Sequence, residues 1–282
     1  MKNIDSSNHL RGQSIYLDDI PLLTGTLFAV AFDSPIAHGV ITKLDLTEAL
    51  DSEGVVRIFT AKDIPGENQI GGIIPDEPLI ADHHVHFCGM PVALVVAESD
   101  ELARMAVKKI KVEISPLPII IDPREAQQKG ELIVQPRTFT LGDSANAFEN
   151  CVHVFEGKVD SNGQEHLYIE TQGAYTVPME NGAIKIYSST QGPTAVQRAC
   201  AKVLGLPMHM LEVDVTRLGG GFGGKEDRAK TWAALCAMAT YHLKRPVKYS
   251  LHRMEDMRMT GKRHPYSSDY KIGLDKDLKI VA

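Results

Sequence analysis

The sequence predicts an α+β fold, because strand-like and helical segments with short connections follow one another along its 282 residues. Residues 91–97 are continuously apolar, which is typical of a strand buried on both faces. Residues 194–204 and 227–242 carry apolar side chains at helical spacing, and Gly205 and Pro246 mark the ends of these helices. At about 150 residues per domain, the length favours two domains.

The first predicted domain covers residues 12–122. Besides residues 91–97, strands are expected at residues 26–32, 39–45, 54–60 and 111–114, with a short helical turn at residues 46–50. Ser99 is a candidate N-cap for a helix whose inward side chains are Leu102, Ala103, Ala106 and Ile110. Residues 123–150 show little periodicity and are interpreted as a linker.

The second predicted domain covers residues 151–282. It contains the two predicted helices, a strictly alternating strand at residues 211–217 and a further strand at residues 247–252. Residues 270–274 and 278–282 flank a polar turn like a hairpin whose second strand is cut off. We therefore expect this domain to be truncated at Ala282.

Composition argues against several kinds of partner. Lys and Arg number 30 against 36 Asp and Glu, a net charge of −6, so no basic field is available for nucleic acid or an anionic membrane. No apolar run approaches the roughly 18 residues that span a bilayer, and the N-terminus lacks the apolar core of a secretory signal. The cysteines form no CxxC pair and predict buried thiols in a reducing cytoplasm: Cys88, Cys151, Cys200 and Cys236.

The most informative motif places five glycines in the six positions 219–224, between a predicted strand and a predicted helix. Backbone without Cβ atoms can lie very close to a bound group, and the free N–H groups of a following helix favour an electron-rich one. A flexible connector is the alternative, but that many glycines are costly in chain entropy. A dinucleotide fingerprint lacks its acidic residue about 20 positions further on. A P-loop would need Ser or Thr where Glu226 stands.

Three smaller signals have ordinary structural explanations beside their functional ones. Glu226 would lie in the first turn of a helix, where the helix dipole also favours a carboxylate. Residues 187–193 end a predicted strand in polar side chains just before a predicted helix. Ser189 or Thr190 could simply be the N-cap of that helix. The histidines at positions 83, 84 and 86 could bind a metal, but a solvated turn is favoured because no Cys or carboxylate completes a zinc set. For His166 a hydrogen-bonded core histidine is favoured.

Several ordered motifs together resemble the molybdenum-binding subunit of the xanthine dehydrogenases, within the xanthine oxidase and aldehyde oxidase family. They are the glycine loop, Ser-Ser-Thr-Gln at 188–191, Gln-Glu-His-Leu-Tyr-Ile-Glu at 164–170 and Thr-Gly-Lys-Arg-His-Pro at 260–265. The resemblance implies an α/β hammerhead domain at residues 12–122 and the first part of a molybdopterin-binding domain at residues 151–282.

The resemblance also implies a chemistry. A molybdenum–molybdopterin cofactor would hydroxylate an electron-poor C–H carbon with oxygen from water, and electrons would pass to [2Fe-2S] clusters and FAD on partner subunits. Gln191 would hydrogen-bond an oxygen ligand of the metal, which the backbone of Phe222, with Gly221 and Gly223, would approach. Glu226 would bind the substrate. It favours a purine such as hypoxanthine or xanthine, because aldehyde-oxidising relatives usually carry an apolar residue there.

Some expected parts lie outside the sequence. Subunits of this family continue far beyond the position of Ala282, and their catalytic base lies near the distant end. We therefore expect no catalytic base in this chain, no turnover by the isolated chain, and a need for the remainder of the molybdenum subunit as well as iron–sulfur and FAD partners. An aldehyde- or carbon monoxide-oxidising relative and a non-catalytic docking fragment are the alternatives.

Overall fold

The computed structural model describes residues 4–282, which fall into two compact units. The first unit comprises the described residues up to Leu117 together with His166–Gly261. The second comprises Pro118–Glu165 and Lys262–Ala282. Each unit combines segments from both predicted domains, so the compact units cut across the division predicted at residues 123–150. That division into domains stays a prediction.

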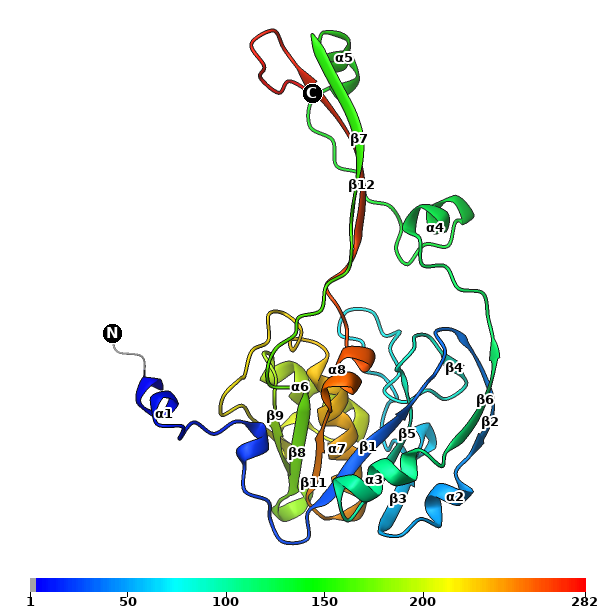
Figure 1. Ribbon diagram of the computed structural model, residues 1–282, viewed down its shortest axis with the longest axis vertical. Coiled ribbons are helices and arrows are strands. Elements are labelled where there is room, and N and C mark those ends of the chain that lie inside the picture. Colours follow the sequence, from blue (N-terminus) through cyan, green and yellow to red (C-terminus); the bar gives the residue numbers. More distant parts are fainter. Residues whose placement is uncertain (1–3) are drawn as a thin grey trace. The chain divides into compact units, whose positions relative to one another are not determined.

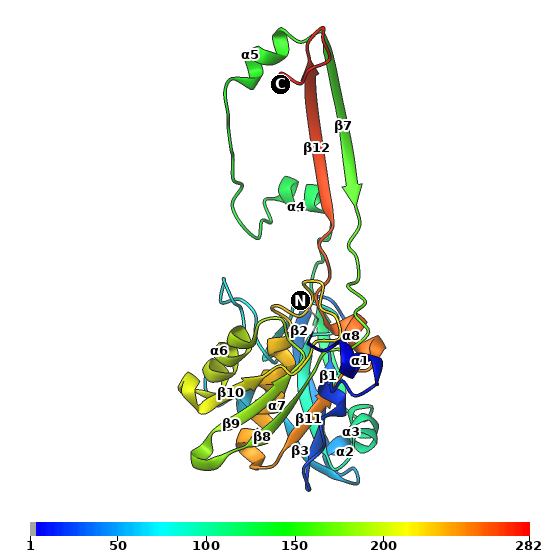
Figure 2. The ribbon, with the colours of Figure 1, turned by 90° about the vertical axis from the view of Figure 1, so that its left-hand side faces the viewer.

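A seven-stranded mixed sheet forms the centre of the first unit (Figure 1). Its strands, in spatial order, are β10 (Leu211–Asp214), β9 (Ile184–Ser188), β8 (Gly173–Pro178), β11 (Val247–Ser250), β1 (Leu27–Asp33), β5 (Pro91–Ala97) and β3 (Val55–Phe59). Figure 2 shows β10, β9, β8, β11 and β1 lying side by side. The parallel pair of β1 with β11 joins strands from the two predicted domains into one sheet.

Helices cover both faces of this sheet. On one face, α6 (Pro193–Leu204) and α7 (Ala229–Leu243) pack in a core that includes Leu94 and Val96 of β5. On the other face, α2 (Thr47–Leu50) and α3 (Asp100–Val107) pack in a core that includes Val95. Because alternate residues of a strand point to opposite faces, all seven residues of β5 are buried, as its apolar run predicts.

The first unit also contains a second, smaller sheet and several short helices. A three-stranded sheet has the order β4 (His84–Val85), β2 (Gly39–Asp45) and β6 (Lys111–Pro116). The other helices are α1 (Ser6–Leu10), α8 (Arg253–Met259) and the 3-10 helices η1 (Leu17–Asp19), η2 (Ala61–Asp63), η3 (Glu180–Gly182) and η4 (Met208–Met210). The Ser99 hydroxyl accepts a hydrogen bond from the Leu102 N–H, so the predicted N-cap of α3 is confirmed. Within residues 4–282, no helix has the length and apolar character that a membrane crossing requires.

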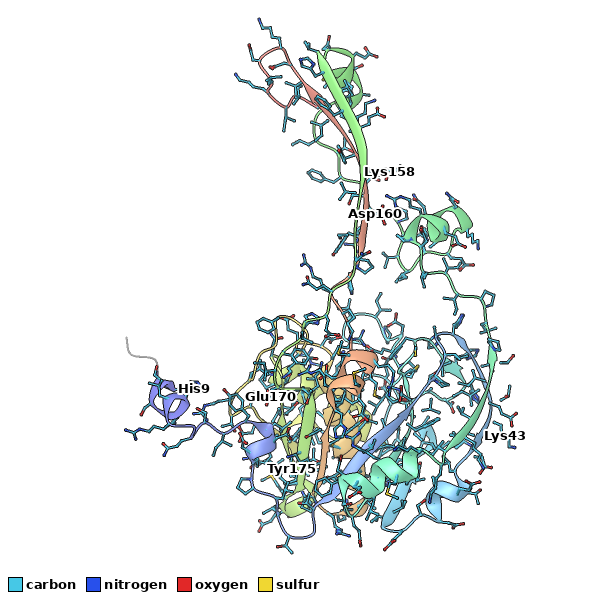
Figure 3. The ribbon with its side chains drawn as sticks, in the orientation of Figure 1. His9, Lys43, Lys158, Asp160, Glu170 and Tyr175 are labelled. Carbon is cyan, nitrogen blue, oxygen red and sulfur yellow. The ribbon has the colours of Figure 1, made fainter. Side chains whose placement is uncertain are left out.

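The second unit is built on a two-stranded antiparallel ribbon of β7 (His153–Ser161) and β12 (Tyr266–Leu274), and Figure 3 labels Lys158 and Asp160 on β7. The segment interpreted as a linker contains two short helices, α4 (Pro123–Lys129) and α5 (Ser144–Glu149). Aspartate side chains cap both, at positions 122 and 143. The predicted hairpin at the C-terminal end is present as a tight return: backbone hydrogen bonds join Gly273 and Asp275 to residues 279–282, with one antiparallel bridge between Leu274 and Ile280.

The four cysteines are free thiols, but the prediction that they are buried is wrong for Cys88 and Cys151 and confirmed only for Cys200 and Cys236. Cys88 is exposed, whereas Cys200 and Cys236 are fully buried, and burial raises the pKa of Cys200 to about 12 and that of Cys236 as well.

We expect Cys88 to react with a thiol reagent at neutral pH at least on the order of 100-fold faster than Cys200 and Cys236, because the reagent reaches these two thiols only when the protein unfolds. Thiol titration with mapping by mass spectrometry measures this, and Cys88→Ser should abolish the fast phase. Rapid labelling of Cys200 in the folded protein would contradict the expectation.

Candidate functional site

The glycine loop, defined here as residues 218–226, lies between β10 and α7. It turns where the Gly224 N–H donates to the Gly221 carbonyl at 2.7 Å. Phe222 (φ +52°) and Gly223 (φ +86°) occupy the left-handed region, and Phe222 is 74% exposed. The helix begins at Ala229, so the predicted start at residue 227 is wrong, because residues 222–228 continue as turns and a bend. Glu226 therefore precedes the helix, and the first turn of α7 contains no acidic residue.

Packing within the protein itself requires at least two of the five glycines. A Cβ on Gly219 would lie 2.4 Å from the Cβ of Glu170, and a Cβ on Gly221 would lie 2.5 Å from the Cδ of Gln191. A Cβ on Gly223 would meet nothing within 4 Å. Access for a ligand therefore does not by itself explain why these positions are glycine. Neighbouring side chains already fill the space at Gly219 and Gly221, whereas the space at Gly223 is open.

Gln191 follows β9 and enters the glycine loop. Its Oε1 accepts hydrogen bonds from the N–H groups of Gly223 (3.0 Å) and Lys225 (3.2 Å), and its own backbone N–H donates to the Lys225 carbonyl (2.9 Å). Because only the oxygen of a side-chain amide can accept, two N–H donors fix the amide with its oxygen toward the loop. Nε2 donates to no group of residues 4–282. The structure thus brings Gln191 and the loop that carries Phe222 together, with a free donor on Gln191.

Ser189 and Thr190 also hold the loop. The Thr190 hydroxyl donates to the Lys225 carbonyl at 3.1 Å and accepts from the Gly192 N–H at 3.0 Å. The Ser189 hydroxyl donates to the Glu170 carboxylate at 2.7 Å. The N-cap residue of α6 is Gly192, and no side chain caps this helix. The alternative that Ser189 or Thr190 serves as the N-cap is therefore wrong.

Sequence reasoning missed a buried ion pair beneath the loop. The Lys225 side chain is 0% exposed, and its Nζ donates to the Glu170 carbonyl (2.6 Å) and the Ser189 hydroxyl (2.6 Å). The Glu170 carboxylate, in the segment before β8 labelled in Figure 3, lies 3.3 Å from Nζ and accepts from the Gly219 N–H at 2.8 Å. Burial lowers the pKa of Lys225, and Glu170 opposes that shift. The available signal was a lysine directly after five glycines, with a glutamate closing the 164–170 motif.

A second buried carboxylate joins the loop to the core of the first unit. Asp256 is 0% exposed and accepts from the Tyr168 hydroxyl (2.8 Å) and the Gln172 backbone N–H (2.6 Å). The Gln172 side chain in turn donates to the Gly224 carbonyl (3.1 Å) and accepts from the Trp232 indole (3.0 Å). Burial raises the pKa of Tyr168, and the Asp256 carboxylate acts in the same direction, so Tyr168 stays a neutral donor. This network connects α7, α8 and the loop.

The predicted substrate residue Glu226 is exposed at the end of the glycine loop. Its carboxylate makes no hydrogen bond or ion pair with any of residues 4–282. The backbone carbonyl of Glu226 lies close to Gly192, where an added Cβ would be 3.2 Å away. The loop therefore presents a carboxylate that is free to bind a molecule from outside.

The histidines named in the sequence lie in two separate places. His84 and His86 are exposed with stacked rings 6.2 Å apart, and His38 stacks on His86 at 6.3 Å. Among the residues that the structure describes, no group of three or more His, Cys, Asp or Glu side chains is arranged to hold a metal. His166 is only half-buried, stacked on Tyr168 beside Gly224, rather than a fully buried core residue.

An open hollow of about 820 Å³ lies beside the loop. It is lined by Tyr16, Asp18, Leu167, Ile169, Glu170, Leu218, Gly219, Gly220 and Phe222. The backbone N–H groups of Gly220, Gly221 and Phe222 donate no hydrogen bond within residues 4–282. Free N–H groups, the free Nε2 of Gln191 and the open space at Gly223 fit a bulky group rich in hydrogen-bond acceptors, such as a metal–pterin with oxygen ligands.

Two family models match the chain. Residues 11–118 match the a/b hammerhead domain of aldehyde oxidase and xanthine dehydrogenase, and residues 125–282 match the molybdopterin cofactor-binding domain. The chain belongs to the aldehyde oxidase and xanthine dehydrogenase family. The resemblance seen in the sequence is confirmed, as is the fold class of a hammerhead domain followed by a molybdopterin-binding domain. The predicted molybdopterin cofactor is the one that the second model names.

Relatives in this family carry different activities in their names. The chain is 40% identical over 274 residues to xanthine dehydrogenase of Drosophila subobscura, covering 96% of this chain and 20% of that protein. It is 36% identical over 282 residues to aldehyde oxidase 2 of Rattus norvegicus, covering 99% and 21%. The aldehyde oxidoreductase structure from Desulfovibrio gigas matches with a TM-score of 0.87 at 27% identity, over 97% of this chain and 32% of that one. The chain spans about a fifth of the length of the curated relatives it matches.

Proposed function

We propose that this chain is part of the molybdenum-binding subunit of a xanthine dehydrogenase-type hydroxylase, which oxidises hypoxanthine or xanthine with oxygen from water. One observation carries the proposal: the Gln191 amide is fixed inside the glycine loop with its donor end free, while Glu226 ends the same loop without a partner. When bound, the molybdenum–molybdopterin cofactor would supply the two-electron oxidation of the C–H carbon.

The residues of the loop have separate tasks in this proposal. Gln191 would donate from Nε2 to an oxygen of the cofactor, and the backbone of Gly221, Phe222 and Gly223 would line the space that holds it. Glu226 hydrogen-bonds the purine ring and stabilises charge that develops on the ring in the transition state, which is typically worth a factor of about 10²–10³ in rate for one such group. Two hydrogen bonds join Gln191 to the loop that Glu226 ends, which supports the assignment of both tasks to one site.

Other parts of the proposed enzyme come from outside residues 1–282. The proposal assigns no catalytic base to this chain, and it requires the remainder of the molybdenum subunit. It also requires [2Fe-2S] and FAD subunits that carry the electrons away from the cofactor. A cytoplasmic location remains a prediction from the sparse cysteines, which the structure describes as free thiols.

The direct experiment is purification of the 282-residue chain, with measurement of its molybdenum and pterin content and of xanthine oxidation. We expect no turnover by the chain alone, and turnover once it is assembled with the remaining molybdenum segment and the electron-carrying subunits. Xanthine turnover by the isolated chain would contradict the proposed division of labour. Capture of an iron–sulfur subunit, with an assembled complex that holds no molybdenum, would support a non-catalytic docking fragment instead.

An aldehyde-oxidising enzyme is the second candidate, and the similarity to a rat aldehyde oxidase favours it. Purines and aldehydes differ in what they offer Glu226, because a purine ring has N–H donors and an aldehyde has only a carbonyl acceptor. The ratio of kcat/KM for xanthine to kcat/KM for a simple aromatic aldehyde, measured on the assembled enzyme, separates the two. A carbon monoxide-oxidising relative would turn over neither.

A further inference from the structure

Both the side chain and the main chain of Lys225 form hydrogen bonds, and they do so with different partners. Its side chain is enclosed, with Nζ donating to the Glu170 carbonyl and the Ser189 hydroxyl. Its main chain forms two hydrogen bonds with Gln191: the Lys225 N–H donates to Oε1 of Gln191, and the Lys225 carbonyl accepts from the Gln191 N–H. A displacement of residue 225 therefore removes two of the three hydrogen bonds that join Gln191 to the main chain of the loop, and leaves the one from the Gly223 N–H.

The acceptors of Nζ are themselves tied to the loop and to the strands. Glu170 accepts from the Gly219 N–H at the start of the loop, and Ser189 directly follows β9. The Tyr168 ring lies under Nζ with its centroid 4.4 Å away. These contacts restrain the Lys225 ammonium, because leaving a buried polar group without a partner is unfavourable.

We propose that Lys225 is a positioning residue, which through Glu170 and Ser189 sets the orientation of the Gln191 amide and so directs its free Nε2 outward. Lys225 does not touch the ligand in this proposal, because its side chain is enclosed beneath the loop. The consequence for cofactor binding rests on the function proposed above. The orientation of Gln191 does not, and it can be measured on the chain without any cofactor.

Lys225→Met tests the proposal, because methionine fills a similar volume but cannot donate to Glu170 or Ser189. Lys230→Met is the matched control: Lys230 is also buried, at 3% exposed, and pairs with Asp227 at 2.6 Å, but it makes no contact with Gln191. The measurement is amide hydrogen exchange in the 282-residue chain, read at residues 223 and 225, whose N–H groups donate to Oε1. We expect Lys225→Met to raise exchange there by about tenfold or more, and Lys230→Met by less than about twofold.

Unchanged exchange at residues 223 and 225 in a folded Lys225→Met chain overturns the proposal, and so does an equal rise in both variants, which would mean general loosening. If Lys225→Met does not fold, Ser189→Ala decides, since it removes one acceptor of Nζ and leaves the ion pair. A rise of about threefold at the same two amides supports the proposal, and no rise overturns it. Failure of the assembled enzyme to oxidise xanthine would count against the proposed function and leave this result intact.

Discussion

Asp256→Ala should lower the free energy of unfolding of the first unit by about 3–5 kcal/mol. The carboxylate is fully buried and accepts from the Tyr168 hydroxyl and the Gln172 N–H. Alanine leaves the Gln172 N–H without its acceptor and opens space in the core, so desolvation and packing losses add. Urea unfolding followed by the fluorescence of Trp232, the single tryptophan, measures the change, because Trp232 is buried beside the same network.

Two further variants give the prediction its control. Asp256→Asn keeps one acceptor and the shape of the side chain, so we expect a smaller loss of about 1–3 kcal/mol. Asp18→Ala removes an aspartate that also has two polar partners, Ser250 and Lys248, but is 60% exposed, and should change the free energy of unfolding by at most about 1 kcal/mol. If the free energy of unfolding of Asp256→Ala lay within about 1 kcal/mol of that of the unaltered protein, the network would contribute little to stability.

Features encoded locally could be predicted from the sequence. The apolar run of β5 is itself the cause of its burial on both faces, and Ser99 caps α3 through a contact only three residues long. The helices α4 and α5 could also have been predicted from local sequence, since each starts at an aspartate N-cap and α4 ends at a left-handed Gly130. They were missed because neither buries an apolar face, so no periodicity marks them.

Features that depend on contacts between residues far apart in the sequence could not be predicted in this way. The acidic residues before α7 are typical of a helix start, but turns and a bend continue through residue 228, after a loop whose hydrogen bond from the Gly223 N–H to Gln191 spans 32 residues. The pairing of Lys225 with Glu170 spans 55 residues and follows no period. The family resemblance named Gln191 and Phe222 for one site, and the structure brings Gln191 against the loop that carries Phe222, because a resemblance of whole segments also implies how those segments are arranged. It said nothing of the lysine beneath them.

Glu226→Ala should lower kcat/KM for xanthine in the assembled enzyme by about 10²–10³-fold and leave oxidation of an aromatic aldehyde within about threefold. The reason is that Glu226 is the carboxylate without a partner at the end of the loop, so its available role is toward a bound molecule. For the same reason the substitution removes no hydrogen bond or ion pair within residues 4–282, and the free energy of unfolding should change by less than about 0.5 kcal/mol. A large loss of stability would mean that the side chain has a structural role after all.

Glu226→Gln separates the charge of this residue from its hydrogen bonds. Glutamine keeps the shape and one acceptor but loses the negative charge, so a loss of kcat with little change in KM would indicate that the carboxylate acts mainly on charge developing in the transition state. A rise in KM alone would instead assign Glu226 to ground-state binding of the purine. Equal losses for xanthine and aldehyde would remove the basis for preferring a purine, because substrate choice would then not depend on this carboxylate.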